Sequence, residues 1–193
     1  MLAGIVYRLE ALSTGHVPVS HGRFVHAAAM QFLTRSNQEM AKVEHDRSDV
    51  NNFTVSMLDF GSRKPIGQEY HLLDGTTCSW RVTAMREDIA RIFLSIQVGE
   101  QIQVGSMEFR VMAVICDPNL STHTGCIGKK DFIAGVFSLP RMRNLTIKFI
   151  SPTTFRVNDR DYPYPLLELI FTSLAKKCEK CLGVDLPINE NKE

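Results

Sequence analysis

The chain has 193 residues, of which 44% are hydrophobic and 22% are charged, and its formal net charge is +1. This is an ordinary globular composition, and no apolar run approaches the ~20 residues that span a bilayer, so we expect no membrane partner. The near-neutral charge argues against a large nucleic-acid footprint unless the basic residues are segregated.

The cysteine content indicates the compartment. The chain has five cysteines, and an odd number, several within apolar segments, is typical of free thiols in a reducing cytoplasm. The first residues alternate as a strand does and do not form a signal peptide, so we expect a cytoplasmic protein. Cys178 and Cys181 form a lone C-x-x-C pair without the further ligands that zinc requires, and their helical spacing favours core packing.

The first third of the chain predicts strands that flank a pair of short helices. Apolar and polar residues alternate at its start, as in a half-buried strand. Ser36 followed by Glu39 is a capping-box pattern, which ends one helix and begins another. The expected elements are a strand at 2–12, helices at 23–33 and 37–45, and a strand from 53.

The middle of the chain continues the same alternation of strands and helices. Asp74-Gly75 is a strong turn dipeptide, which predicts a hairpin. The further expected elements are strands at 68–73 and 77–85, a helix at 87–96 and a hairpin at 101–115. The resulting order, β-α-β-(β)-β-α-β, is the split βαβ, ferredoxin-like arrangement of the α+β class, with the helices on one face of an antiparallel sheet.

Residues 118–143 read as a linker with a short helix or strand near 133–137. A strand pattern at 144–157 restarts the alternation, and a helix at 165–182 follows, with Gly183 as its C-cap. We therefore expect a first domain at 1–117 and the start of a second one at 144–193.

Two stretches carry a resemblance to a known family. The first is residues 22–58, with a small helix, Ser-Asn-x-x-x-Ala from Ser36, His45-Asp46 and Phe-Thr-x-Ser from Phe53. The second is residues 144–156, NLTIKFISPTTFR. Together they resemble the CRISPR repeat-RNA endoribonucleases, which cut precursor crRNA in antiviral defence and belong to the RAMP superfamily of RNA-binding ferredoxin-like proteins.

The resemblance implies two ferredoxin-like domains, of which the second is incomplete here. A second βαββαβ unit needs about 50 more residues after the predicted helix, and the glycine-rich loop that the family carries near its C-terminus is absent. An unfinished unit exposes an unpaired strand and an apolar helix face. This favours a homodimer or a partner chain that completes the second domain.

His45 is the predicted catalytic residue. An imidazolium in the last turn of a helix faces carbonyls without partners, and an imidazole that titrates near neutrality can take or give a proton. The resemblance implies that a histidine in this context cleaves repeat RNA without a metal or any cofactor, by attack of the 2'-hydroxyl and with a cyclic phosphate product. His21 and His26 are the alternative catalytic residues. His21 could bind a phosphate at the start of the helix, whereas the position of His26 beside the apolar face favours a partly buried structural histidine.

Two departures from the family leave a second function open. The resemblance puts a tyrosine and a lysine in the fuller catalytic set, and this chain has Met30 and Asn51 at those positions. A catalytically inactive RNA-binding remnant, or a subunit of a crRNA complex, is therefore an alternative to the enzyme, and an interaction module without RNA is a third.

Basic residues are the expected RNA contacts because they neutralise phosphates. They are Arg23, Arg47, Arg63, Lys64, Lys129, Lys130, Arg141 and Arg143.

Overall fold

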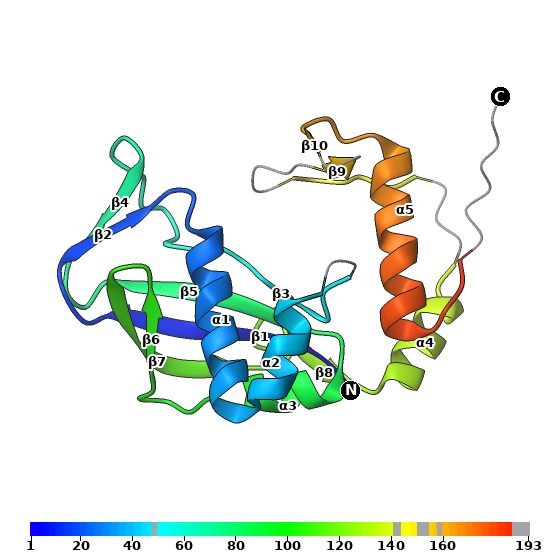
Figure 1. Cartoon of the computed structure of the whole chain (residues 1–193), viewed down its shortest axis with the longest axis horizontal. Coiled ribbons are helices and arrows are strands. Elements are labelled where there is room, and N and C mark those ends of the chain that lie inside the picture. The colour runs from blue at the N-terminus through cyan, green and yellow to red at the C-terminus, as the bar shows by residue number, and fades with distance from the viewer. Residues whose placement is uncertain (48–49, 141–143, 150–154, 158–159, 187–193) are drawn as a thin grey trace. The chain divides into compact units, whose positions relative to one another are not determined.

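The computed structural model describes residues 1–47, 50–140, 144–149, 155–157 and 160–186, and the chain divides into two compact units, Met1–Lys129 and Lys130–Glu193. Most of the first unit is a sheet with helices on it (Figure 1). Its elements are β1 (Leu2–Ala11), β2 (Gly15–Pro18), α1 (Gly22–Ser36), α2 (Gln38–His45), β3 (Phe53–Val55), β4 (Glu69–Leu72), β5 (Thr77–Ala84), α3 (Glu87–Leu94), β6 (Gln101–Val104), β7 (Met107–Ile115) and β8 (Gly125–Ile127).

The main sheet has the order β3-β5-β1-β7-β6, with β8 also paired to β1, and each neighbouring pair is antiparallel. The stretch β7-β1-β5-β3 is the strand order of a split βαβ unit, in which each crossover helix skips one strand. Helices α1, α2 and α3 lie over the same face of the sheet (Figure 1). The predicted α+β, ferredoxin-like class of the first domain is confirmed.

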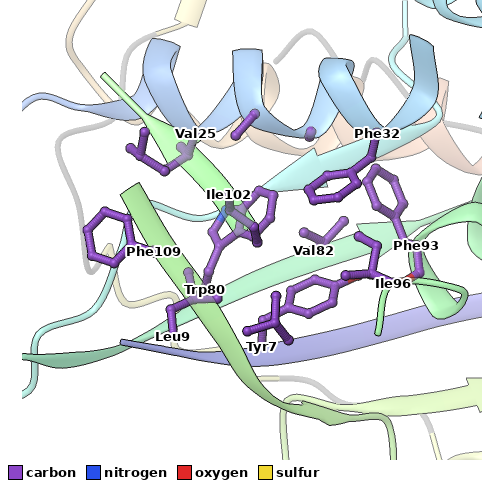
Figure 2. Packing of buried hydrophobic residues seen from close by; sticks show 14 of the residues in the cluster. Tyr7, Leu9, Val25, Phe32, Trp80, Val82, Phe93, Ile96, Ile102 and Phe109 are labelled. Carbon is purple, nitrogen blue, oxygen red and sulfur yellow. The ribbon is translucent and has the colours of Figure 1, made fainter. Parts of the chain in front are cut away.

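Large apolar side chains fill the space between the sheet and the helices (Figure 2). Tyr7 on β1 and Trp80 on β5 are fully buried, with ring centroids 5.4 Å apart. The Tyr7 hydroxyl donates a hydrogen bond of 2.7 Å to the carbonyl of Phe93, which ties α3 to β1. Burial raises the pKa of Tyr7, so the hydroxyl remains a donor at all working pH values.

The predicted hairpin between residues 68–73 and 77–85 is wrong. The turn exists, with Gly75 at φ +78°, but β4 pairs with β2 in a separate two-stranded sheet. Both edges of β5 are occupied, one by β1 and the other by β3. No edge of β5 is therefore left to pair with β4, although the two strands are close in sequence.

The predicted capping box is also wrong, by one residue. Ser36 is the last residue of α1, which runs further than expected, and Asn37 is the N-cap of α2. The Asn37 backbone is extended, and its Oδ1 accepts a hydrogen bond of 2.9 Å from the amide of Met40. Asparagine satisfies an amide of the first turn as well as serine does, so the division into two helices is still explained by a cap.

The second unit contains α4 (Lys129–Ser138, which begins at the boundary), β9 (Phe155–Val157), β10 (Arg160–Tyr162), α5 (Leu167–Lys177) and a π-helical turn at Cys178–Leu182. Gly183, at φ +65°, ends this helical segment as predicted. The described residues 144–149 are not in a strand, contrary to the expectation for 144–157, and residues 150–154 lie outside the described part. The expected linker, 118–143, contains β8 and α4.

None of the helices in the described ranges is both long and apolar enough to cross a membrane.

Candidate active site

His45 is the last residue of α2 and points into solvent. Its side chain is 75% exposed, and its Nδ1 lies 3.3 Å from Oδ1 of Asp46. The helix is held at its other end by the Asn37 cap, and the amide of Asp46 donates to the carbonyl of Lys42 in the last turn. The imidazole is therefore accessible to a ligand, and its backbone is fixed by a regular helix end.

His26 lies on α1 and stacks on Phe53, the first residue of β3. The ring centroids are 5.3 Å apart, and the ring planes differ by 6°. Burial against this ring lowers the pKa of His26, and the positive charge of His45 lowers it further. Two predicted histidines from different helices thus interact electrostatically, and both burial and the charge of His45 favour the neutral form of His26.

His21, the other alternative, cannot meet a phosphate. Its side chain is buried, and both ring nitrogens are used within the protein. Nδ1 donates to the carbonyl of Pro18 at 2.7 Å, and Nε2 accepts from the amide of Leu58 at 2.7 Å. This assignment makes His21 a neutral structural residue that joins the start of α1 to the segment after β3. Burial accordingly lowers its pKa, and the backbone hydrogen bonds oppose this only in part.

Arg47 and Arg86 flank the loop that follows His45. Nη2 of Arg47 lies 3.5 Å from the Glu44 carboxylate, and Nη1 of Arg86 lies 3.6 Å from the same oxygen. Arg47 was an expected RNA contact, whereas the position of Arg86 beside the same carboxylate was not expected. The sequence does not indicate that Arg86 lies near Glu44, because Arg86 precedes α3 and is far along the chain from α2. Only the fold brings Arg86 and Glu44 together.

The other expected basic contacts that the structure describes are distributed over α1, the loop before β4 and α4. The Arg23 guanidinium is 5.0 Å above the Phe24 ring, and Nη1 of Arg63 donates to the carbonyl of His71. Lys64, Lys129 and Lys130 are exposed, and Arg141 and Arg143 lie outside the described residues. Their role as RNA contacts stays a prediction.

The two positions that depart from the family's fuller catalytic set have different surroundings. Met30 is half-buried and packs on the core, whereas Asn51 is exposed in the loop after His45. Neither side chain supplies a cation or an acidic proton. Among the described residues, no group of three or more His, Cys, Asp or Glu is arranged to hold a metal ion.

The sheet order and the helical layer define a ferredoxin-like protein, and comparison with known proteins identifies the family. The family model of the CRISPR Cas6 N-terminal domain matches residues 1–125, which is more than half of the chain. The chain therefore belongs to the Cas6 family, as the resemblance of its motifs implied. No curated protein sequence matches it.

Solved structures of Cas6 proteins share the fold over nearly the whole chain. The product complex of the Thermus thermophilus Cas6 protein TTHB231 has 19% identity and a TM-score of 0.71, with 97% of this chain and 68% of that chain covered. The product complex of the Cas6 protein TTHA0078 has 26% identity and a TM-score of 0.66, with 96% and 66% covered. A Cas6-related protein from Pyrococcus furiosus has 14% identity and a TM-score of 0.62. The chain thus spans about two thirds of the length of the first two structures.

Proposed function

We propose that this protein binds CRISPR repeat RNA and cleaves precursor crRNA without a metal, with His26 and His45 as the proton-transfer pair. The family membership supports the substrate, since two of the similar structures are Cas6 proteins with their product. The observation that carries the chemistry is the exposed His45 imidazole at the end of α2, together with a second imidazole, His26, that stacks on Phe53 and interacts electrostatically with His45.

The proposed reaction needs one base and one acid. The base removes the proton of a 2'-hydroxyl, whose oxygen attacks the adjacent phosphorus, and the bond from phosphorus to the 5'-oxygen breaks. The acid protonates this leaving oxygen, which gives a 2',3'-cyclic phosphate and a 5'-hydroxyl. His26, with its lowered pKa, is the proton acceptor, and His45, beside Asp46 and the carbonyls of the last turn of α2, is the proton donor.

Cleavage of the cognate repeat RNA in excess EDTA tests the proposal. We expect cyclic phosphate product from the wild type, and a loss of about 10²- to 10⁴-fold in the single-turnover rate for His45→Ala and for His26→Ala. His71→Ala, which removes an exposed histidine on β4, is the matched control and should cleave normally. An RNA with a 2'-deoxy sugar at the cut position should bind and remain intact. Cleavage that depends on added Mg²⁺, or that survives His45→Ala, would overturn the proposal.

The second candidate function is RNA binding without cleavage. It is favoured by Met30 and Asn51, because neither side chain supplies the proton or the cation that the tyrosine and the lysine of the family's fuller set bring to the transition state. In that case the wild type retains the repeat RNA, the affinity falls linearly with the logarithm of salt concentration, and no product forms in the assay above.

The expected homodimer or partner chain stays a prediction. Apolar side chains of the second unit are exposed, among them Phe137, Leu167 and Phe171. Light scattering after size exclusion, over a tenfold range of protein concentration, distinguishes a monomer from a dimer. A dimer that dissociates when Phe171 is replaced by Ser would support self-association through this unit.

A further inference from the structure

The carboxylate of Glu44 lies directly before the exposed His45 and is inaccessible to solvent. Its side-chain exposure is 0%, although it belongs to the short surface helix α2. Burial of a carboxylate is strongly unfavourable unless hydrogen bonds and opposite charges compensate for the lost water. The structure supplies both, from the connection between α2 and β3 and from the residue before α3.

Asn52 provides the hydrogen bonds. Its Nδ2 donates to Oε1 of Glu44 at 2.7 Å, and its backbone amide is 3.4 Å from Oε2. Arg47 and Arg86 provide the charge, at 3.5 and 3.6 Å from Oε1. The same carboxylate thus joins the last turn of α2, the start of β3 and the segment before α3.

These contacts fix the residues beside both imidazoles. Glu44 precedes His45, and Asn52 precedes Phe53, on which His26 stacks. The carbonyl of Asn52 also accepts a 2.7 Å hydrogen bond from the amide of Met85, which anchors it to the end of β5. The two ends of the intervening loop are therefore joined by buried hydrogen bonds between Glu44 and Asn52.

We propose that Glu44 is a positioning residue that holds His45 beside His26, and the proposal rests on the cleavage function proposed above. Glu44 touches no substrate, because its carboxylate is enclosed by Asn52, Arg47 and Arg86. Glu44 contributes to the cleavage rate by fixing geometry. The two imidazoles come from different helices, and their separation must be kept when RNA binds. A displacement of about 1 Å in such an arrangement can lower a rate by about 10²-fold.

Glu44→Gln and Asn52→Ala in the full chain test the proposal. Glutamine keeps the size of Glu44 and an oxygen for Nδ2 of Asn52, but it removes the buried negative charge that Arg47 and Arg86 face, while Arg86 keeps its ion pair with Asp88. Alanine at position 52 removes the hydrogen bond and keeps the charges. We expect each variant to bind repeat RNA within about twofold of the wild type and to lose about 10- to 100-fold in the single-turnover cleavage rate.

An NMR titration of the histidine ring protons gives a readout that does not depend on cleavage. In the wild type, the charge of His45 contributes to the lowered pKa of His26. If Glu44→Gln moves His45 away, the pKa of His26 should rise, as it should in His45→Ala. The double variant should show no further rise, because the two changes remove the same interaction.

Ile102→Val is the stability control, since it trims the buried core on β6 without touching Glu44 or the histidines. Equal slowing of cleavage by this variant would show that Glu44 acts only through stability and would overturn the proposal. An unchanged His26 titration in Glu44→Gln would overturn it as well. A wild type that does not cleave would overturn the proposed function alone, and the NMR titration would still decide the role of Glu44.

Discussion

The two units of this protein differ in how they use their apolar residues. The first unit buries a continuous cluster from β1, β5, β6, β7 and all three of its helices. In the described part of the second unit, Cys181 is the one buried hydrophobic residue, and the apolar side chains of α4 and α5 face outward in whole or in part. Similar periodic sequences thus lead to a closed core in one unit and an open surface in the other. Periodicity therefore specifies an element but not what covers its apolar face.

The largest expected effect is a difference between core truncations in the two units. Phe93→Ala should destabilise the first unit by about 3–5 kcal/mol, because the ring is fully buried and leaves a cavity. Phe171→Ala removes a ring that is 42% exposed and should change stability by less than about 0.5 kcal/mol. Urea unfolding measures this when Trp80 fluorescence, from the single tryptophan in the first core, is followed together with hydrogen exchange of the α5 amides in the second unit. Similar losses in both variants would contradict the contrast.

The second expected effect is a pH dependence confined to the first unit, which contains all six histidines. Folding lowers the pKa of His21, so the unfolded chain binds its proton more readily. Above the pKa of an unfolded-state histidine, about 6.5, His21 is neutral in both states and does not lower the free energy of unfolding. As the pH falls below that value, the free energy of unfolding decreases by at most about 1.4 kcal/mol per pH unit because of this group. His26 acts in the same direction.

His21→Gln should lower the stability of the first unit at neutral pH and flatten its decline toward acid. Urea midpoints between pH 5 and 8, again from Trp80 fluorescence, give the two slopes. Parallel curves for the variant and the wild type would show that the buried imidazole is not the group that titrates.

A third, smaller effect concerns the helix cap in the first unit. Asn37→Ala should destabilise this unit by about 1 kcal/mol, because the amide of Met40 loses its acceptor. Ser36→Ala, one residue earlier, should change little, since the structure assigns Ser36 to the end of α1. Thermal unfolding of the two variants checks this, and a larger loss at position 36 would restore the capping box that the sequence suggested.

The smallest expected effect concerns a helix cap in the second unit. Leu166 is the N-cap of α5 and makes no side-chain hydrogen bond there. Leu166→Asp should stabilise this helix by about 0.5–1 kcal/mol, because a carboxylate accepts from the first-turn amides and suits the helix dipole. Hydrogen exchange of the α5 amides should slow, while exchange of the β1 amides should not change. Faster exchange in α5 would show that Leu166 packs better than its exposure indicates.

Much of the first unit was predictable from local patterns. The alternation in β1 placed Ile5, Tyr7 and Leu9 on the buried side, and the hairpin of β6 and β7 turns at Gly105, which has φ +63°. The hairpin from β4 to β5 was not predictable, because a turn dipeptide does not reveal that β1 and β3 already occupy both edges of β5.

The candidate site divides in the same way. His45 could be found from its position at a helix end. His26 was found only as an alternative, because its stacking on Phe53 and its interaction with the charge of His45 arise when α1 and β3 pack together. His21 fits the same local pattern as a phosphate-binding histidine, yet both of its nitrogens bind backbone groups.

The order of most strands and helices in the first unit, and the histidine at the end of α2, followed from the chain alone, since periodicity and helix ends are local properties. Strand β2 was not expected, and β8 lies in the expected linker. The pairing of strand edges, the burial of His21 and the approach of Arg86 to Glu44 required the folded structure, because they depend on contacts between residues that are distant in sequence, whereas Arg47 meets Glu44 at i,i+3 spacing.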